Sequence, residues 1–273
     1  MDIYEELVRL RKLGQKCALA TIVEVNGSIP SFESAKMLIR EDGSIVGTVG
    51  GGCVEAEVWN AAREVMETEK ARNLRFNLGQ SAAYDNGLIC GGQLSVFVEP
   101  VIPQPQVLIF GGGHVSRAIS QIATTAGFST VIIDDRESFA NHERFPEAAA
   151  VHAGEYEQLF PALTVNSATY IVIVTRGHRD DMRVLRWAAT TQPRYLAMIG
   201  SRRKVEMTKK MFSQSGICTL EELEKVDMPM GLSIAAEDPE EIAISILAKM
   251  IEVKNKVNSK LQITEKENQS FSK

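Results

Sequence analysis

The sequence predicts an α/β protein whose C-terminal part is a parallel sheet with helices on both faces, preceded by a smaller α+β domain. Three observations support this fold class. From residue 106 onward, apolar runs alternate with segments of helical periodicity. The run 107–110 leads directly into Gly111-Gly112-Gly113, and a second apolar run ends in Asp134. A strand, a glycine turn, a helix and a strand that ends in a carboxylate form a Rossmann-like nucleotide-binding unit.

The first hundred residues have the mixed pattern of a separate domain. Strands are predicted over 19–25, 35–40, 45–49 and 94–98, and apolar residues at helical spacing predict a helix from Val54 to Val65. The following segment, 101–105, is rich in proline and predicts a stiff linker. We therefore expect an N-terminal α+β domain at residues 1–100.

The second domain is expected at residues 106–253. Its predicted strands are 107–110, 130–134, 149–152, 170–174 and 194–199, and its predicted helices are 114–126, 180–190 and 203–214. A last helix is predicted after Asp238, because this residue can cap it and Pro239 suits the first turn. Polar residues dominate segment 254–273, which we expect to be a disordered tail.

Composition excludes several classes of protein. The formal net charge of −5 disfavours binding to nucleic acid or to an anionic membrane. No apolar run approaches the ~20 residues of a membrane helix, and the N-terminus lacks the apolar core of a signal peptide. We therefore expect a cytoplasmic protein whose cysteines, Cys17, Cys53, Cys90 and Cys218, are reduced thiols.

Ligands of an open parallel sheet bind beyond the carboxyl ends of its strands, and polar clusters follow several of the predicted strands. Gly111, Gly112 and Gly113, followed by His114, offer backbone N–H groups and a helix N-terminus to a phosphate. A purely structural glycine turn is the alternative. Asp134 lies roughly 20 residues further on, where a ribose-binding carboxylate is expected.

Two more clusters follow the strands 170–174 and 194–199. Ser201, Arg202 and Arg203 suit contacts to phosphate oxygens, although such a run is also common on a solvated helix face. Arg176 and His178 belong to the other cluster. His114 and His178 could be ligands or proton donors, or ordinary hydrogen-bonding groups.

Two cysteines lie among glycines in the N-terminal domain. Cys53 follows Gly50, Gly51 and Gly52 at a predicted helix start, and the second thiol is in the Cys90-Gly91 segment. A helix N-terminus stabilises the thiolate, which is the form that attacks or binds a metal. Burial in tight turns is the alternative. A zinc site is disfavoured, because no Cys-x-x-Cys pair or nearby histidine accompanies either thiol.

A series of motifs in both domains resembles the xanthine dehydrogenase accessory factors of the XdhC/CoxI group. The motifs are GSIP (27–30), AKML (35–38), GTVGGGCVE (47–55), GLICGG (87–92), FGGGHV (110–115), DDR (134–136), TRGH (175–178), MIGSRRK (198–204) and AEDPEEIA (236–243). The chain departs from the usual pattern at Ser31, Phe32 and Ser34, where the family has an arginine after the proline and a glycine before the Ala-Lys pair.

The resemblance implies a chaperone and not an enzyme with turnover of its own. Such proteins bind molybdenum cofactor, as molybdopterin or its nucleotide form, while its sulfido ligand is installed, and deliver it to xanthine dehydrogenase or a related molybdenum hydroxylase. The implied partners are that hydroxylase and a cysteine desulfurase, and we expect a homo-oligomer. By this resemblance Cys53 or Cys90 could contact molybdenum or relay sulfur.

Two other classes of protein stay open at this point. An NAD(P)-dependent oxidoreductase would use the glycine turn for its cofactor and His114 or His178 near the nicotinamide. A molybdopterin nucleotidyltransferase would need paired carboxylates for magnesium, such as Asp134 with Asp135 or Asp180 with Asp181. Adjacent carboxylates in a strand point to opposite faces, which weakens the first pair.

Overall fold

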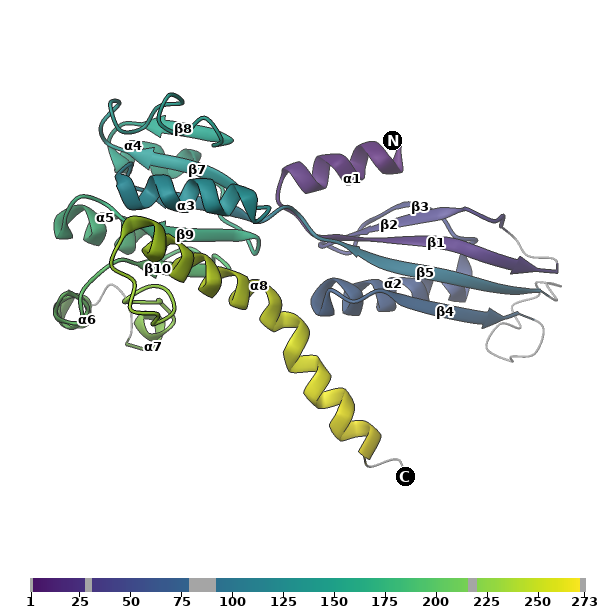
Figure 1. Ribbon diagram of the computed structural model, residues 1–273. Helices are drawn as coiled ribbons and strands as arrows, with labels where there is room; N and C mark the ends of the chain where they lie inside the picture. The colour runs from purple at the N-terminus through teal and green to yellow at the C-terminus, as the bar shows by residue number, and fades with distance from the viewer. Residues whose placement is uncertain (1, 28–30, 79–91, 216–219, 271–273) are drawn as a thin grey trace. The chain divides into compact units, whose positions relative to one another are not determined.

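The structure is a computed structural model, and it describes residues 2–27, 31–78, 92–215 and 220–270. The chain divides into two compact units, one formed by Met1–Pro103 with Lys256–Lys273 and the other by Gln104–Asn255 (Figure 1). None of the helices in these described ranges is long and apolar enough to cross a membrane.

The first unit is built on an antiparallel sheet with the strand order β3-β2-β1-β5-β4. Its elements are α1 (Ile3–Lys12), β1 (Cys17–Asn26), β2 (Lys36–Arg40), β3 (Ile45–Gly47), α2 (Gly52–Thr68), β4 (Arg72–Asn77) and β5 (Gln93–Val101).

Alternate residues of these strands reach opposite faces of the sheet, and a helix covers part of each face. Ala18, Ala20 and Ile22 of β1 pack with the apolar side of α2. Cys17 and Leu19 point the other way and pack with α1. The sheet therefore has one core under α2 and a smaller one under α1.

The second unit is a parallel sheet with the order β10-β9-β6-β7-β8. Its elements are β6 (Gln106–Phe110), α3 (His114–Thr125), β7 (Ser129–Asp134), β8 (Ala150–Ala153), α4 (Tyr156–Leu159), a 3-10 turn (Phe160–Ala162), β9 (Thr169–Ile173), α5 (His178–Ala188), β10 (Tyr195–Met198), α6 (Arg202–Ser215), α7 (Leu220–Glu224) and α8 (Pro239–Ser270).

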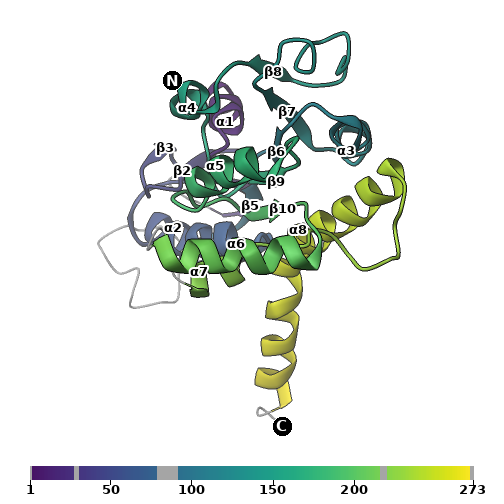
Figure 2. The ribbon, with the colours of Figure 1, turned by 90° about the vertical axis from the view of Figure 1, so that its left-hand side faces the viewer.

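Helices cover both faces of this parallel sheet. Val107 and Ile109 of β6 pack on the side of α3 and α8, whereas Leu108 and Phe110 pack on the side of α4, α5 and α6. Figure 2 shows the strands with α3 and α8 to the right and α4 and α5 to the left. The fold class predicted from the sequence is confirmed, because a Rossmann-like sheet follows a smaller antiparallel one.

Several elements differ from the sequence prediction: it does not include the short helices α4 and α7, and β4, α5 and α8 differ as well. β4 was not predicted, because Leu74 and Phe76 are too few apolar residues to mark a strand alone. α5 begins at His178 and not at residue 180, since Gly177 is its N-cap. α8 continues to Ser270, where the sequence predicts disorder from residue 254. Lys, Glu and Gln are good helix formers, so a polar segment can extend a helix that has already begun.

Helix α1 is tied to the sheet by one carboxylate. The Glu6 side chain is 1% exposed and accepts hydrogen bonds from Arg9 Nε at 2.7 Å and from Arg40 Nε of β2 at 2.6 Å. These hydrogen bonds lower the pKa of Glu6 to about 2, and the bond from Arg9 has a larger effect than the bond from Arg40. The ionised carboxylate is therefore the form that the fold stabilises.

We expect Glu6→Gln to change how stability depends on pH. The folded pKa of Glu6 is depressed, so its contribution is present above the unfolded value of about 4.3 and is lost as the pH falls toward 2. Urea unfolding of the wild type between pH 6 and 2.5 should show this loss, and the variant should lack it. Glu5→Gln changes an exposed neighbour on the same helix and should leave the wild-type profile intact. Identical profiles for wild type and Glu6→Gln would contradict the assignment.

Candidate functional site

The strand order of the second unit places the carboxyl ends of β6 and β9 next to each other. The chain runs from β6 to β7 on one side, and β9 pairs with β6 on the other. Ligands of open parallel sheets bind in the crevice at such a switch point. The glycine turn follows β6 and the segment with Arg176 follows β9, so these two predicted clusters flank the crevice.

The first two glycines of the turn are required by close packing. Gly111 has a φ of 111°, and a Cβ there would lie 2.8 Å from the carbonyl carbon of Val174, just after β9. A Cβ on Gly112 would lie 2.8 Å from the carbonyl carbon of Phe139. Real Cβ atoms do not approach backbone this closely, so only glycine lets these segments meet.

The third glycine faces open space instead. Gly113 is the N-cap of α3, and a Cβ on it would meet no atom within 4 Å. The next two amides, of His114 and Val115, donate to no acceptor in the part of the chain that the structure describes. His114 itself is exposed. The start of α3 therefore presents unused N–H groups and the positive end of a helix dipole.

Asp134 holds the turn in place. The carboxylate is 1% exposed and accepts a hydrogen bond from the Gly112 amide at 2.7 Å, and Arg136 donates to both of its oxygens, Nε at 2.8 Å and Nη2 at 2.9 Å. Burial acts to raise the pKa of Asp134, but these bonds outweigh burial and keep the pKa below its usual value. Both oxygens are thus engaged by the protein at the place where the sequence suggests a ribose contact.

Arg176 pairs across the crevice with the residue after Asp134. Its Nη2 lies 2.6 Å from Oδ2 of Asp135, and its Nε lies 3.5 Å from Asp180. Burial and the adjacent Asp134 raise the pKa of Asp135, although Arg176 acts to lower it. The Arg176 side chain remains 53% exposed, so it can still reach a ligand.

A buried ion pair joins α5 and α6, the helices that follow β9 and β10. Asp181 is fully buried, accepts a hydrogen bond from Thr175 Oγ1 at 2.6 Å and pairs with Lys204 Nζ. A buried carboxylate needs such partners, and they fix the first turn of α6 against α5. Because Lys204 is engaged here, the exposed Arg203 is the first-turn cation directed to solvent. Ser201 precedes α6 and accepts from the Lys204 amide at 3.4 Å, and the side chain of Arg202 lies outside the described part.

His178 has unusual surroundings for a polar side chain. It is the first residue of α5, and both of its ring nitrogens are buried with no hydrogen-bond partner among the described residues. It borders a pocket of about 380 Å³ that Met182 and Met211 also line. Buried polar atoms are nearly always hydrogen-bonded, so His178 has capacity that the protein itself does not use.

The first unit has a glycine turn of its own, which differs from the turn at residues 111–113. Gly50, Gly51 and Gly52 all have positive φ, of 119°, 78° and 61°. Glu55, in the first turn of α2, folds back onto this turn and accepts hydrogen bonds from Thr48 Oγ1 and from the Val49 amide.

The Glu55 carboxylate supplies an internal anion for this turn. Burial acts to raise its pKa, but hydrogen bonds from Thr48 and from the amides of Val49, Gly51 and Gly50 keep it lowered. Cys53 is half-buried beside the turn, in the first turn of α2. Cys90 and Gly91, the other predicted thiol segment, and also Cys218, lie outside the described residues.

Two residues at the crevice escaped the sequence analysis. The ring of Phe139 packs under the guanidinium of Arg136, 3.6 Å from its centroid, and Arg144 Nη2 donates to the carbonyl oxygen of Gly112 at 3.3 Å. No periodicity marks the segment between β7 and β8, so the sequence carries no signal for either residue. No group of three or more His, Cys, Asp or Glu that could hold a metal ion occurs among the described residues.

The departures from the family pattern also have a structural outcome. The Ala35 amide donates to the Phe32 carbonyl at 3.1 Å and closes a turn in which Ser34 has a φ of 73°. A positive φ at this position favours glycine, the residue that the resemblance leads us to expect there. Phe32 is 69% exposed, so the side chain in this loop packs little against the sheet.

We expect Gly111→Ala to destabilise the second unit and Gly113→Ala to be tolerated. The first change combines a φ of 111° with a backbone clash and should lower the free energy of unfolding by at least about 2 kcal/mol. The second has a φ of −74° and open space, so the cost should stay within about 1 kcal/mol. Chemical denaturation of both variants measures the difference. Equal losses would show that the turn is not packed as described.

Comparisons with known proteins agree with this architecture. Residues 107–250 match the family described as the XdhC Rossmann domain, and residues 10–77 match the XdhC and CoxI family. The crystal structure of a Bacillus halodurans protein described as a xanthine dehydrogenase has a TM-score of 0.51 at 23% identity, covering 94% of this chain and 96% of that one, which shows a shared fold.

Three curated relatives match most of the chain. The uncharacterized protein YqeB of Escherichia coli K12 is 34% identical over 93% of this chain, which spans only 47% of YqeB. The molybdenum cofactor insertion chaperone PaoD of the same organism is 26% identical, over 88% of this chain and 84% of PaoD. A Bacillus subtilis protein described as a probable component of xanthine dehydrogenase is 20% identical, over 89% of this chain and 94% of that protein. The family matches cover more than half of the sequence, and the chain belongs to the XdhC and CoxI family.

Proposed function

We propose that this chain is an accessory protein that binds molybdenum cofactor, protects it during sulfuration and delivers it to xanthine dehydrogenase or a related molybdenum hydroxylase. Membership of the XdhC and CoxI family supports this role, as does a relative named as a molybdenum cofactor insertion chaperone. The proposal includes no catalytic turnover by the chain itself. A cysteine desulfurase as sulfur source and a homo-oligomeric state belong to the same proposal.

The unused amides at the start of α3 are the observation that carries the proposal. They lie at the switch point of a parallel sheet, where anionic ligands bind, and Gly113 leaves the approach to them open. Molybdopterin carries a phosphate, and its nucleotide form carries a diphosphate. Either group suits the N–H groups of His114 and Val115.

The first turn of α6 adds positive charge at the same edge of the sheet. Cations at a helix N-terminus oppose the helix dipole, so Arg203 is in an unfavourable place unless an anion lies nearby. The ion pair with Asp181 offsets the unfavourable interaction of Lys204 with the helix dipole, whereas Arg203 is exposed. A bound phosphate would relieve Arg203 in the same way, and we assign the guanidinium to that contact.

Cys53 is the residue of the first unit that we assign to the reactive end of the cargo. A thiol in the first turn of α2 lies at the positive end of that helix dipole, and the neighbouring Gly51 and Gly52 leave open space. Cys90 is a second candidate from the sequence.

We expect the chain purified from a host that makes molybdenum cofactor to carry molybdenum, phosphorus and pterin fluorescence. Arg203→Glu should lower the molybdenum retained per chain by about tenfold or more, because a phosphate contact is replaced by repulsion. Lys210→Glu makes the same change of charge further along α6, at an exposed position, and should retain the metal. A folded wild type that never takes up the cofactor would overturn the proposed function.

We expect Cys53→Ala to lose cofactor retention or transfer, measured as reactivation of a cofactor-free molybdenum hydroxylase. Cys17→Ala is the matched control: this thiol is fully buried between the sheet and α1, and burial raises its pKa to about 11. Full transfer by both variants would remove Cys53 from the proposal and leave the phosphate contacts untouched.

The alternative of an NAD(P)-dependent oxidoreductase is disfavoured by Asp134. The NAD form of such an enzyme needs a carboxylate turned toward a ribose, and the NADP form needs an arginine there. Asp134 is instead buried, and both of its oxygens bind Gly112 and Arg136. Stabilisation of the protein by NADH, without uptake of the molybdenum cofactor, would favour the oxidoreductase instead.

A further inference from the structure

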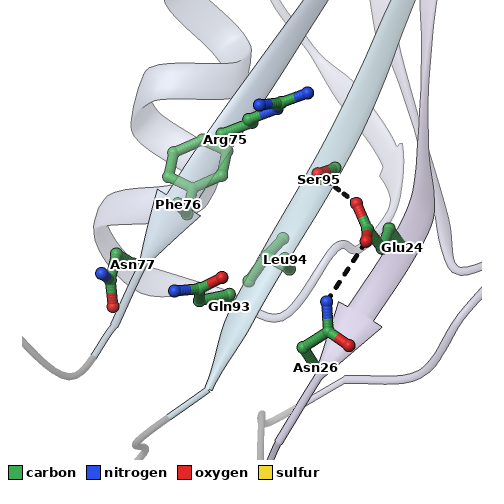
Figure 3. Close-up of a pocket in the computed structure, with 8 residues that line it drawn as sticks. All are labelled: Glu24, Asn26, Arg75, Phe76, Asn77, Gln93, Leu94 and Ser95. Carbon is green, nitrogen blue, oxygen red and sulfur yellow. Dashed lines mark hydrogen bonds between the residues drawn. The ribbon is translucent and has the colours of Figure 1, made fainter.

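The first unit carries a polar pocket that the proposed function does not use. The pocket has a volume of about 370 Å³ and lies at the ends of β1, β5 and β4 (Figure 3). Its polar lining comes from three adjacent strands: Glu24, Asn26, Arg75, Asn77, Gln93 and Ser95. Small-molecule pockets span about 300–1,000 Å³, so this one is large enough for a single bicyclic ring.

Strand pairing arranges these side chains in rows across the sheet. Ser95 of β5 lies opposite Glu24 on one side and opposite Arg75 on the other. Gln93 lies in the same way between Asn26 and Asn77. Residues two apart on a strand share a face, so both rows project from one face of the sheet.

The first row has a buried floor and two charged walls. Ser95 is only 6% exposed, whereas Glu24 and Arg75 are exposed. The Glu24 carboxylate is oriented over this floor, because it accepts hydrogen bonds from Ser95 Oγ and from Asn26 Nδ2, each at 3.2 Å. Figure 3 shows the carboxylate between these two partners.

The two charges of the row do not neutralise each other. Two strand spacings separate the Glu24 and Arg75 backbones by about 10 Å, and neither side chain forms an ion pair among the described residues. An acceptor on β1 and a donor on β4 therefore flank Ser95, with β5 between them.

A ligand that lies between them needs a donor edge toward Glu24 and an acceptor edge toward Arg75. A 2-amino-4-oxopyrimidine ring, as in pterin or guanine, has both. Its ring N–H and amino group form a parallel pair of donors that matches a carboxylate. Its carbonyl oxygen and the adjacent ring nitrogen form the acceptor pair that arginine recognises bidentately in guanine.

We propose that this pocket binds a pterin or guanine ring, with Glu24 on the donor edge and Arg75 on the acceptor edge. The inference rests on the proposed function for the expectation that a pterin is the ring met in the cell. Glu24 and Arg75 both belong to the first unit, apart from the α3 and α6 contacts of the proposed function.

The test titrates free pterin, guanosine monophosphate and adenosine monophosphate into the full chain, with pterin fluorescence and calorimetry as readouts. The first two should bind, and adenosine monophosphate should not, because adenine lacks the adjacent N–H and amino donors. Glu24→Gln and Arg75→Gln should each weaken binding by about tenfold or more, since each removes charged hydrogen bonds. Glu41→Gln, an exposed carboxylate in the turn between β2 and β3, should leave binding unchanged.

Each outcome of this test is decisive. Glu24 and Arg75 are exposed, so the variants should fold, and their melting temperatures check this. Loss of binding in the two folded variants supports the site. The ring that binds with the lower Kd, pterin or guanine, is then the ligand that the pocket prefers. No binding by the wild type, equal binding of adenine, or unchanged affinity of Glu24→Gln would overturn it. The assay contains no molybdenum, so its failure would leave the metal retention of the wild type and of Arg203→Glu to be judged separately.

Discussion

The candidate site of the second unit depends on one steric constraint, the absence of a side chain at Gly111 and Gly112. At these positions the turn after β6 meets the backbone at Val174 and at Phe139. The Asp134 carboxylate then fixes the turn by accepting from the Gly112 amide, with Arg136 as its counter-charge. Only with the turn in this position do the first amides of α3 point outward beyond the sheet.

The two glycine turns of the chain show how an internal anion changes what a turn can do. In the first unit, the Glu55 carboxylate binds the amides around Gly50 and Gly51, so part of the positive potential of that turn is used within the protein. In the second unit the Asp134 carboxylate accepts, among the amides of the glycine turn, only from that of Gly112, and the amides of His114 and Val115 are left for a ligand. Similar sequence motifs therefore have different chemistry, decided by where the nearest carboxylate is held.

Much of the fold follows from the sequence because it depends on local patterns. The alternation of apolar runs and helical repeats predicted the parallel sheet, and the run into Gly111 predicted the start of α3. The pairing of Asp134 with Arg136 and of Asp181 with Lys204 could not be predicted, because it depends on which side chains meet after folding. β4 escaped detection for a related reason: its few apolar residues form a strand only because β5 provides a partner.

Ser34 shows that the loop before β2 accepts a residue other than glycine in a left-handed conformation. Its backbone keeps a left-handed conformation, with a φ of 73°, that costs an L-residue about 1–2 kcal/mol more than glycine. The conformation persists because hydrogen bonds on both sides, from Ser34 to Ile22 and from Ile22 to Ala35, fasten the loop to β1. The path of the main chain at this position is thus set by its hydrogen bonds to β1, and a residue other than glycine can occupy it.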